Sequence, residues 1–203
     1  MPAHKSVFIN DIVSPKGRFA FPHLAKPDEG GQYSDGKFKV TLLIPKDSDM
    51  TALKQAIGSC AREAWGGKVK PKDLCHMPLR DGDEKTNLDG YAGCWYVTAK
   101  SSKRRRIVDR KREDIAPEDA YGGCEGRLVL TAMSYEQGGK PGVTFLLDTV
   151  QKLGEGQAFG GGGGNVSILD DGEFDEKGSD PTAHLSEEAP DNDDGDDEDD
   201  WMN

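Results

Sequence analysis

The sequence predicts an all-β fold, in which a small antiparallel β-barrel with one inserted helix is followed by a disordered acidic tail. Three observations predict this arrangement. Several segments in residues 1–153 alternate apolar and polar side chains with the period of a strand. One segment alone has helical spacing. After residue 153 the composition changes abruptly to glycine and acidic residues.

Six segments rich in β-branched and aromatic residues are predicted as strands. In residues 36–44 every second residue from position 38 is apolar, and Lys37, Lys39 and Thr41 lie between them. The last two segments flank a glycine-rich turn at 137–140, which is typical of a hairpin. In chain order, the predicted strands are 5–13, 17–21, 36–44, 93–100, 126–135 and 142–150.

Residues 48–65 are predicted to form the inserted helix, since their apolar residues recur at intervals of three and four. Ser48 or Asp49 can cap its first turn, and the Gly66-Gly67 pair ends it. Residues 68–89, with Pro71 and Pro78, are predicted as a loop.

Five or six strands with one helix in a body of this length favour a closed or partly closed barrel. An OB-fold-like barrel is the first candidate, although the pattern alone also permits a sandwich. The run of five glycines at 160–164 is costly to order. We therefore expect a barrel domain at 1–153, a glycine-rich linker at 154–169 and a disordered acidic tail at 170–203.

The net charge of −11 hides a strong segregation of charge. Residues 154–203 hold 17 of the 37 acidic residues and one of the 26 Lys and Arg residues. The body therefore carries 20 acids and 25 bases, a net +5, and the tail carries −16. A basic body with an acidic tail is compatible with a nucleic acid as partner.

The cysteines and histidines form no recognisable metal or disulfide pattern. Cys60, Cys75, Cys94 and Cys124 have wide, irregular spacings. No signal peptide or membrane span is evident, so we expect a cytoplasmic protein with reduced thiols that binds no membrane. No motif of an NTPase, metalloprotease or serine hydrolase occurs, and we expect no enzymatic activity and no cofactor.

A dense basic cluster follows the predicted strand 93–100. Eight of the thirteen residues from 100 to 112 are Lys or Arg. Such a cluster suits phosphate neutralisation, which releases condensed counterions. A solvated loop or a localisation signal would have the same composition.

Aromatic and basic side chains share one face of three predicted strands. Tyr96 and Lys100 lie on the face opposite Trp95, and Arg127 and Tyr135 share a face of the segment 126–135. A sheet face of this kind can stack bases and follow a phosphate backbone without reading sequence. Each aromatic residue could instead belong to the core; we expect this of Trp95, and expect Tyr96 and Tyr135 to be exposed.

The sequence therefore predicts a single-stranded DNA-binding body. Its candidate DNA contacts are Phe19, Phe21, Lys37, Lys39, Arg80, Tyr96, Lys100, Lys103, Arg104, Arg105, Arg106, Arg110, Lys111, Arg112, Arg127 and Tyr135. The acidic tail can compete with DNA for the basic face or contact partner proteins. Its candidate residues are Asp196, Asp197, Glu198, Asp199, Asp200 and Trp201.

Five blocks of the body resemble the phage single-stranded DNA-binding proteins with an OB fold and an acidic C-terminal tail. They lie at 17–22, 37–46, 78–83, 121–127 and 142–151, and a glycine-rich linker follows them. The resemblance implies a protein that coats unwound DNA in replication and recombination. It also implies a tail that contacts replication proteins and restrains DNA binding. Trp201 is third from the end, whereas several such proteins end on an aromatic residue.

Two alternatives remain open at this stage. Asp81, Asp83 and Glu84 could hold Mg²⁺ in a nuclease, and Cys75-His76 could begin a metal site with the other cysteines. The chain could instead be an acidic DNA mimic whose tail binds a basic partner. The sequence leaves open whether the protein is a monomer or a dimer.

Overall fold

The computed structural model describes residues 5–29 and 34–159. The linker beyond residue 159 and the predicted tail, 170–203, lie outside the described residues. In chain order the strands are β1 (Phe8–Val13), β2 (Gly17–His23), β3 (Phe38–Pro45), β4 (Leu79–Asp81), β5 (Cys94–Ser101), β6 (Arg106–Val108), β7 (Glu125–Gln137) and β8 (Lys140–Gly154). The helix α1 (Thr51–Trp65) follows β3, and three short 3₁₀ helices lie at Pro71–Asp73, Gly82–Glu84 and Pro117–Asp119.

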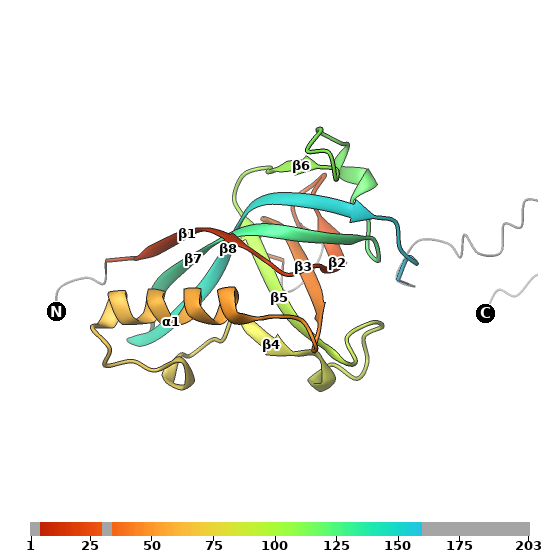
Figure 1. The fold of residues 1–203 in the computed structure, drawn as a ribbon. Coiled ribbons are helices and arrows are strands. Elements are labelled where there is room, and N and C mark those ends of the chain that lie inside the picture. Colours follow the sequence, from red (N-terminus) through yellow and green to blue (C-terminus); the bar gives the residue numbers. More distant parts are fainter. Residues whose placement is uncertain (1–4, 30–33, 160–203) are drawn as a thin grey trace, which may run out of the picture. The chain divides into compact units, whose positions relative to one another are not determined.

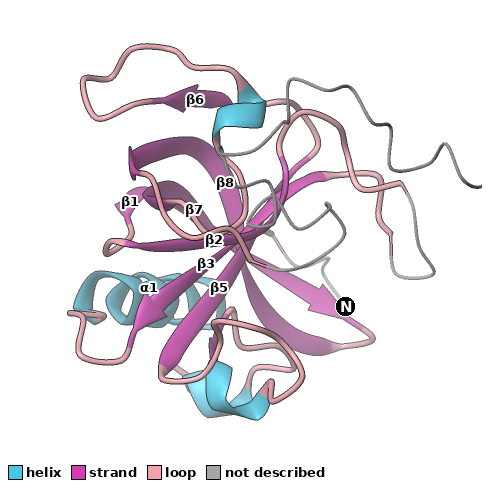
Figure 2. Ribbon diagram, turned by 90° about the vertical axis from the view of Figure 1, so that its right-hand side faces the viewer, coloured by secondary structure: helices cyan, strands magenta, loops and turns pink. Residues whose placement is uncertain are grey.

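Five strands close into a barrel in the order β2, β3, β5, β8 and β7, and β7 pairs with β2 to complete the ring. Three further strands extend it, since β1 pairs with β7, β4 with β5 and β6 with β8 (Figures 1 and 2). This is a barrel of the OB type, strand-rich with one helix, as the sequence predicts.

The expectation of a purely antiparallel barrel is wrong in two pairings. Strand β8 runs parallel to β5, with Ala99 opposite Phe145, and parallel to β6, with Ile107 opposite Val150. The sequence does not reveal the β6–β8 pairing because β6 is three residues long and lies within the basic cluster 100–112. No local pattern gives the relative direction of β5 and β8, which are distant in sequence. The short β4 falls in a segment predicted as loop, since only three residues separate Pro78 from Gly82.

The core fills the barrel with the alternate residues that the strand pattern predicts. Val40, Leu42 and Ile44 of β3 are wholly buried, and Leu128 and Leu130 of β7 belong to the same core. These apolar faces hold the strands together by removing their side chains from water.

Phe19 belongs to this core, which corrects its prediction as a DNA contact. Its side chain is wholly buried on β2. A Cβ placed on Gly126 would lie 2.1 Å from Phe19 Cζ, so the ring fills the space that the glycine leaves. A residue enclosed in this way cannot stack on a base.

Helix α1 packs on β1 and β7 (Figure 1). Its buried face includes Leu53, Ile57 and Cys60, as predicted. The helix begins at Thr51 rather than Ser48, and Met50 occupies the N-cap position. Asp49 Oδ1 nevertheless accepts a hydrogen bond of 2.9 Å from Thr51 N. Gly66 ends the helix in the left-handed region at φ 61°, where glycine is favoured.

A second apolar cluster lies on the outside of the barrel. Ala20, Leu43, Tyr91, Cys94 and Tyr96 form it, and Phe159 packs against it. The cluster covers the outer faces of β2, β3 and β5, so part of the outer barrel surface is itself apolar.

All four cysteines are free thiols. Cys60, Cys94 and Cys124 are buried and Cys75 is exposed. Burial raises the pKa of Cys60 and of Cys124 to about 11, and also raises the pKa of Cys94.

Candidate nucleic-acid interface

A groove of about 760 Å³ lies on the outside of the barrel. Its walls come from the segment that joins β2 to β3, from β4 with the residues before it, and from the β7–β8 hairpin. The floor includes the outer face of β5. Its lining residues are Asp35, Lys37, His76, Pro78, Arg80, Tyr96, Thr98, Lys100, Met133, Tyr135, Gln137 and Thr144.

Five of the predicted DNA contacts gather in this groove: Lys37, Arg80, Tyr96, Lys100 and Tyr135. The sheet register explains how residues far apart in sequence meet. Arg80 on β4 is opposite Tyr96 on β5, and Lys100 of β5 is opposite Leu146 of β8.

Tyr135 reaches the groove through the β7–β8 hairpin. It is opposite Gly142, and a Cβ at Gly142 would lie 2.5 Å from Tyr135 Cζ. The ring therefore lies against the backbone of β8. Burial raises the pKa of the Tyr135 phenol above its ordinary value.

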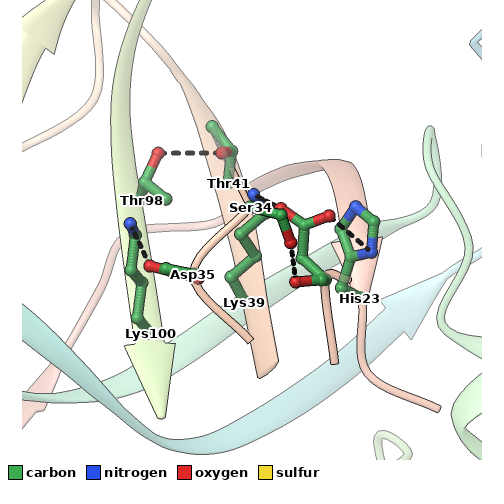
Figure 3. A network of polar contacts seen from close by, with 8 residues as sticks. His23, Ser34, Asp35, Lys39, Thr41, Thr98 and Lys100 are labelled. Atoms are coloured by element: carbon green, nitrogen blue, oxygen red, sulfur yellow. Dashed lines mark hydrogen bonds and ion pairs between the residues drawn. The ribbon is translucent and has the colours of Figure 1, made fainter. Parts of the chain in front are cut away.

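Two carboxylates occupy the basic face in this structure (Figure 3). Asp35 Oδ2 lies 2.6 Å from Lys100 Nζ, and the hydrogen bond from Lys100 lowers the pKa of Asp35. Asp28 pairs with Lys39, whose backbone is opposite Lys100 in the β3–β5 ladder. Both acids come from the segment between β2 and β3, so this segment neutralises cations of the adjacent sheet.

His76 also belongs to the groove and is absent from the sequence-based prediction. Arg80 Nη2 lies 2.5 Å from His76 Nδ1. Burial, and then the charges of Arg80 and Lys100, lower the pKa of His76. The sequence gives no sign of this, because the contact depends on how residues 71–78 return to the barrel.

Phe8 is a second residue absent from the prediction. It is opposite Met133, a groove residue, and half of its surface is exposed. An exposed aromatic side chain beside a groove residue is a further surface for stacking a base. The strand alternation around Phe8 is visible in the sequence, but it does not distinguish the outer face from the core.

Tyr96 is 8% exposed, so the expectation that it is exposed is wrong. The ring of Tyr91 packs edge-on against it, with 5.2 Å between the centroids. What remains accessible of Tyr96 lines the groove. Trp95, predicted as core, is partly buried against the core, and Lys46 Nζ lies 5.5 Å from its ring centroid.

Of the basic cluster at residues 100–112, only Lys100 lines the groove. Lys103 and Arg104 are exposed, and Arg105 donates a hydrogen bond of 2.8 Å to Ser101 Oγ. Arg106 begins β6 and pairs with Asp114 at 2.5 Å. The remaining three cations, Arg110, Lys111 and Arg112, are exposed on the turn that follows β6.

Three other predicted contacts also lie outside the groove lining. Phe21 is 53% exposed at the irregular end of β2, with φ 45°. Arg127 is opposite Gln151, and its Nε is buried with no hydrogen-bond partner within the described part of the chain. Lys39 is held by Asp28, as described above.

Two of the three acids considered for a nuclease site, Asp81 and Asp83, are engaged in local structure. Asp81 Oδ1 and Asp83 Oδ2 lie 2.7 and 2.5 Å from Lys46 Nζ. Asp81 also caps the 3₁₀ helix by accepting from Asp83 N. Within residues 5–29 and 34–159, no group of three or more His, Cys, Asp or Glu side chains is placed to hold a metal ion.

A search of the described helices finds none with the length and hydrophobicity needed to span a bilayer. The candidate tail residues Asp196, Asp197, Glu198, Asp199, Asp200 and Trp201 lie outside the described residues.

A five-stranded barrel with a basic, aromatic groove on its outer face, here over β5 and the β7–β8 hairpin, suits an OB-fold oligonucleotide-binding protein. Residues 10–181 match the family model described as Enterobacter phage Enc34, ssDNA-binding protein. The chain belongs to this family of phage single-stranded DNA-binding proteins. It is also 34% identical over 166 residues to protein p50 of Acyrthosiphon pisum secondary endosymbiont phage 1, covering 76% of this chain and 89% of the relative.

Two solved structures have a similar fold. The single-stranded DNA-binding protein of bacteriophage Enc34 in complex with ssDNA is 27% identical, with a TM-score of 0.58, covering 76% of this chain and 89% of that one. Gp2.5, the single-stranded DNA-binding protein of bacteriophage T7, is 19% identical, with a TM-score of 0.52 and coverage of 74% and 93%. At 19% identity, the similarity to gp2.5 shows a shared fold and nothing further.

Proposed function

We propose that this chain binds single-stranded DNA without base specificity, along the groove over β5 and the β7–β8 hairpin. One observation carries the proposal: Lys37, Arg80 and Lys100 share a single groove with Tyr135 and part of Tyr96. The likeness to a phage protein solved with ssDNA supports it. The absence of enzymatic activity is part of the proposal.

Phosphates pair with the cations of the groove, and bases stack on Tyr135 and on the accessible part of Tyr96. In this structure Asp35 and Asp28 occupy the places of phosphates on Lys100 and Lys39. A polynucleotide with many charges displaces these single carboxylates because each phosphate contact also releases counterions. Stacking does not depend on base identity, so binding tolerates any sequence.

The basic cluster extends the path of the DNA beyond the groove. Because the cluster begins at Lys100, which lines the groove, a strand bound in the groove can continue along Lys103, Arg104 and Arg105. Arg106, Arg110, Lys111 and Arg112 provide further positive charge around β6. Phe21 and Arg127 are proposed as peripheral contacts at the ends of β2 and β7.

The tail is proposed to regulate binding and to recruit replication or recombination proteins in the cytoplasm of the infected cell. Its net charge of −16 allows it to compete with DNA for the basic body. Asp196–Asp200 supply most of the charge near its end, and Trp201 supplies an apolar anchor.

A filter-binding comparison tests the central proposal. Single-stranded and double-stranded oligonucleotides of the same sequence are titrated with the full chain, with and without Mg²⁺. We expect preferential retention of the single strand, equal for several base compositions and unaffected by Mg²⁺. Equal affinity for duplex, or degradation of the labelled strand with Mg²⁺, would overturn the proposal.

A chain ending at residue 161 tests the tail. We expect it to bind single-stranded DNA more tightly than the full chain, with the largest difference at low salt, where screening is weakest. Equal or weaker binding across a salt series would remove the regulatory role from the tail.

A further inference from the structure

Phe159 occupies an aromatic slot on the outside of the barrel. Its ring packs against the outer cluster formed by Ala20, Leu43, Tyr91, Cys94 and Tyr96. The guanidinium carbon of Arg18 lies 4.8 Å from the ring centroid, which is a cation–π contact. Phe159 N donates a hydrogen bond of 3.2 Å to Gly122 O, which anchors the backbone of the segment.

Glycines on the surrounding loops leave room for this ring. A Cβ at Gly90 would lie 2.4 Å from Phe159 Cε1, and Gly90 has φ 80°, where a side chain is disfavoured. At Gly123 a Cβ would lie 2.1 Å from Gln157 O, so the residues before Phe159 also lie close against the barrel. The slot therefore fits a flat ring closely.

The slot and the groove adjoin each other on one surface. Tyr96 belongs both to the cluster under Phe159 and to the groove lining. Leu43 of the cluster is opposite Tyr96 in the β3–β5 ladder, and Thr41 and Thr98 are joined by a hydrogen bond of 2.8 Å on the same face. A strand that leaves the groove past Tyr96 reaches the slot on the neighbouring strands.

We infer that this slot is a second nucleobase-binding site, which Phe159 fills in this structure. A pyrimidine base has the flat shape and the π-face of the phenyl ring, and Arg18 can stack on either. When a base enters, the ring of Phe159 leaves the slot. This inference rests on the proposed function, since it assigns one further subsite to the same strand of DNA.

Hydrogen exchange of the full chain provides a direct test. Most contacts with DNA slow the exchange of backbone amides, whereas displacement of Phe159 frees the amide that donates to Gly122 O. We expect the peptide covering residues 155–159 to exchange faster when an oligothymidylate is added, while peptides from β5 exchange more slowly. Unchanged or slower exchange in 155–159, with β5 protected, would overturn the inference. No protection anywhere would instead contradict the proposed function.

Substitution of Phe159 gives an independent test by affinity. In the full chain, Phe159→Ala should tighten binding of oligothymidylate by about 3- to 10-fold, since the site no longer has a competing occupant. The gain should persist at high salt, where competition by the charged tail is screened. Phe159→Trp refills the slot and should bind as the natural chain does. A fall in melting temperature with no change in affinity for Phe159→Ala would make the ring structural only, and would overturn the inference.

Substitution of Arg18 tests whether a base occupies the slot once Phe159 has been removed. In the Phe159→Ala background, Arg18→Ala should weaken binding several-fold because the base no longer has a guanidinium stacked on it. Lys16→Ala is the matched control: it removes the same charge two residues away, from an exposed side chain that pairs with Glu125 at 2.6 Å. Equal losses of affinity for Arg18→Ala and Lys16→Ala would show that Arg18 contributes only its charge. That result would contradict the inference that a base binds in the slot.

Discussion

The Asp35 carboxylate lies 2.6 Å from the Lys100 ammonium, and both residues line the groove. The basic cluster begins at Lys100, so a phosphate that passes from the groove to the cluster must replace this carboxylate. The contact is partly exposed, at 41% for Lys100 and 29% for Asp35, so screening keeps its contribution to stability small. A phosphate can therefore replace Asp35 on Lys100 with little loss of folding free energy.

Asp35→Asn should therefore tighten binding of single-stranded DNA at low salt. We expect a gain of about 2- to 5-fold, because DNA no longer has to break one exposed ion pair. Fluorescence anisotropy with a labelled oligonucleotide measures the change. Glu63→Gln on α1 removes the same charge from a helix residue that does not line the groove, and should have a smaller effect. Matching gains for both variants would assign the effect to net charge alone.

Replacing Arg104, Arg105 and Arg106 together by Ala should lower the salt dependence of binding. For single strands the slope of log K against log salt falls by about 0.7 for each phosphate that the protein no longer neutralises. Lys54, Arg62 and Lys68, in or just after α1, provide the charge-matched triple control. A slope that is the same for the basic-cluster variant as for the unmodified chain would exclude this loop from the DNA path.

Tyr135→Ala should weaken binding by about 5- to 150-fold, the range expected when one stacked base has no ring beneath it. Tyr135→Phe should bind nearly as well as the original, because stacking uses the ring face and not the hydroxyl. Thermal unfolding of both variants separates a stacking role from a packing role against Gly142. Similar reductions of affinity for the Phe and Ala variants would contradict stacking.

His76 should couple DNA binding to proton uptake. Burial and the charges of Arg80 and Lys100 hold its pKa low, and the other charged or titratable groups around this groove are Asp35, Lys37, Cys75, Tyr96 and Tyr135. A phosphate between Arg80 and Lys100 offsets their repulsion and raises the pKa of the imidazole. Binding should therefore strengthen as pH falls below the ordinary pKa of histidine, about 6.5.

The same group has the opposite effect on folding. Because the folded pKa of His76 is depressed, its stabilising contribution is complete above the unfolded value and declines as pH falls from there toward the folded value. His76→Asn should remove both dependences, which anisotropy and chemical denaturation at several pH values can measure. A pH profile of binding that persists in His76→Asn would assign the proton to another group.

The sequence predicts the elements that depend on local pattern. Alternation identifies the buried face of β3, and the paired glycines after Trp65 mark the end of α1. The same reasoning places Tyr96 and Lys100 on one face of β5, because side chains on one strand face remain together whatever the register. It does not extend to Arg80, since β4 lies in a segment predicted as loop.

What the sequence could not predict depends on irregular backbone or on distant contacts. The i, i+2 spacing of Phe19 and Phe21 suggests one shared face, but the β2–β3 register shifts after Ala20 and Phe21 adopts φ 45°. Tyr96 is covered by Tyr91, which returns from a loop without strand periodicity. The contact between His76 and Arg80 likewise arises from loop geometry.

The distribution of thiols makes the native chain suitable for labelling at a single position. Maleimides react with the thiolate, and burial holds Cys60, Cys94 and Cys124 in the protonated form. Cys75 is exposed, and its amide donates to Pro141 O, which places it beside the β7–β8 hairpin and next to His76 of the groove. A fluorophore attached there would report the arrival of DNA without an engineered cysteine.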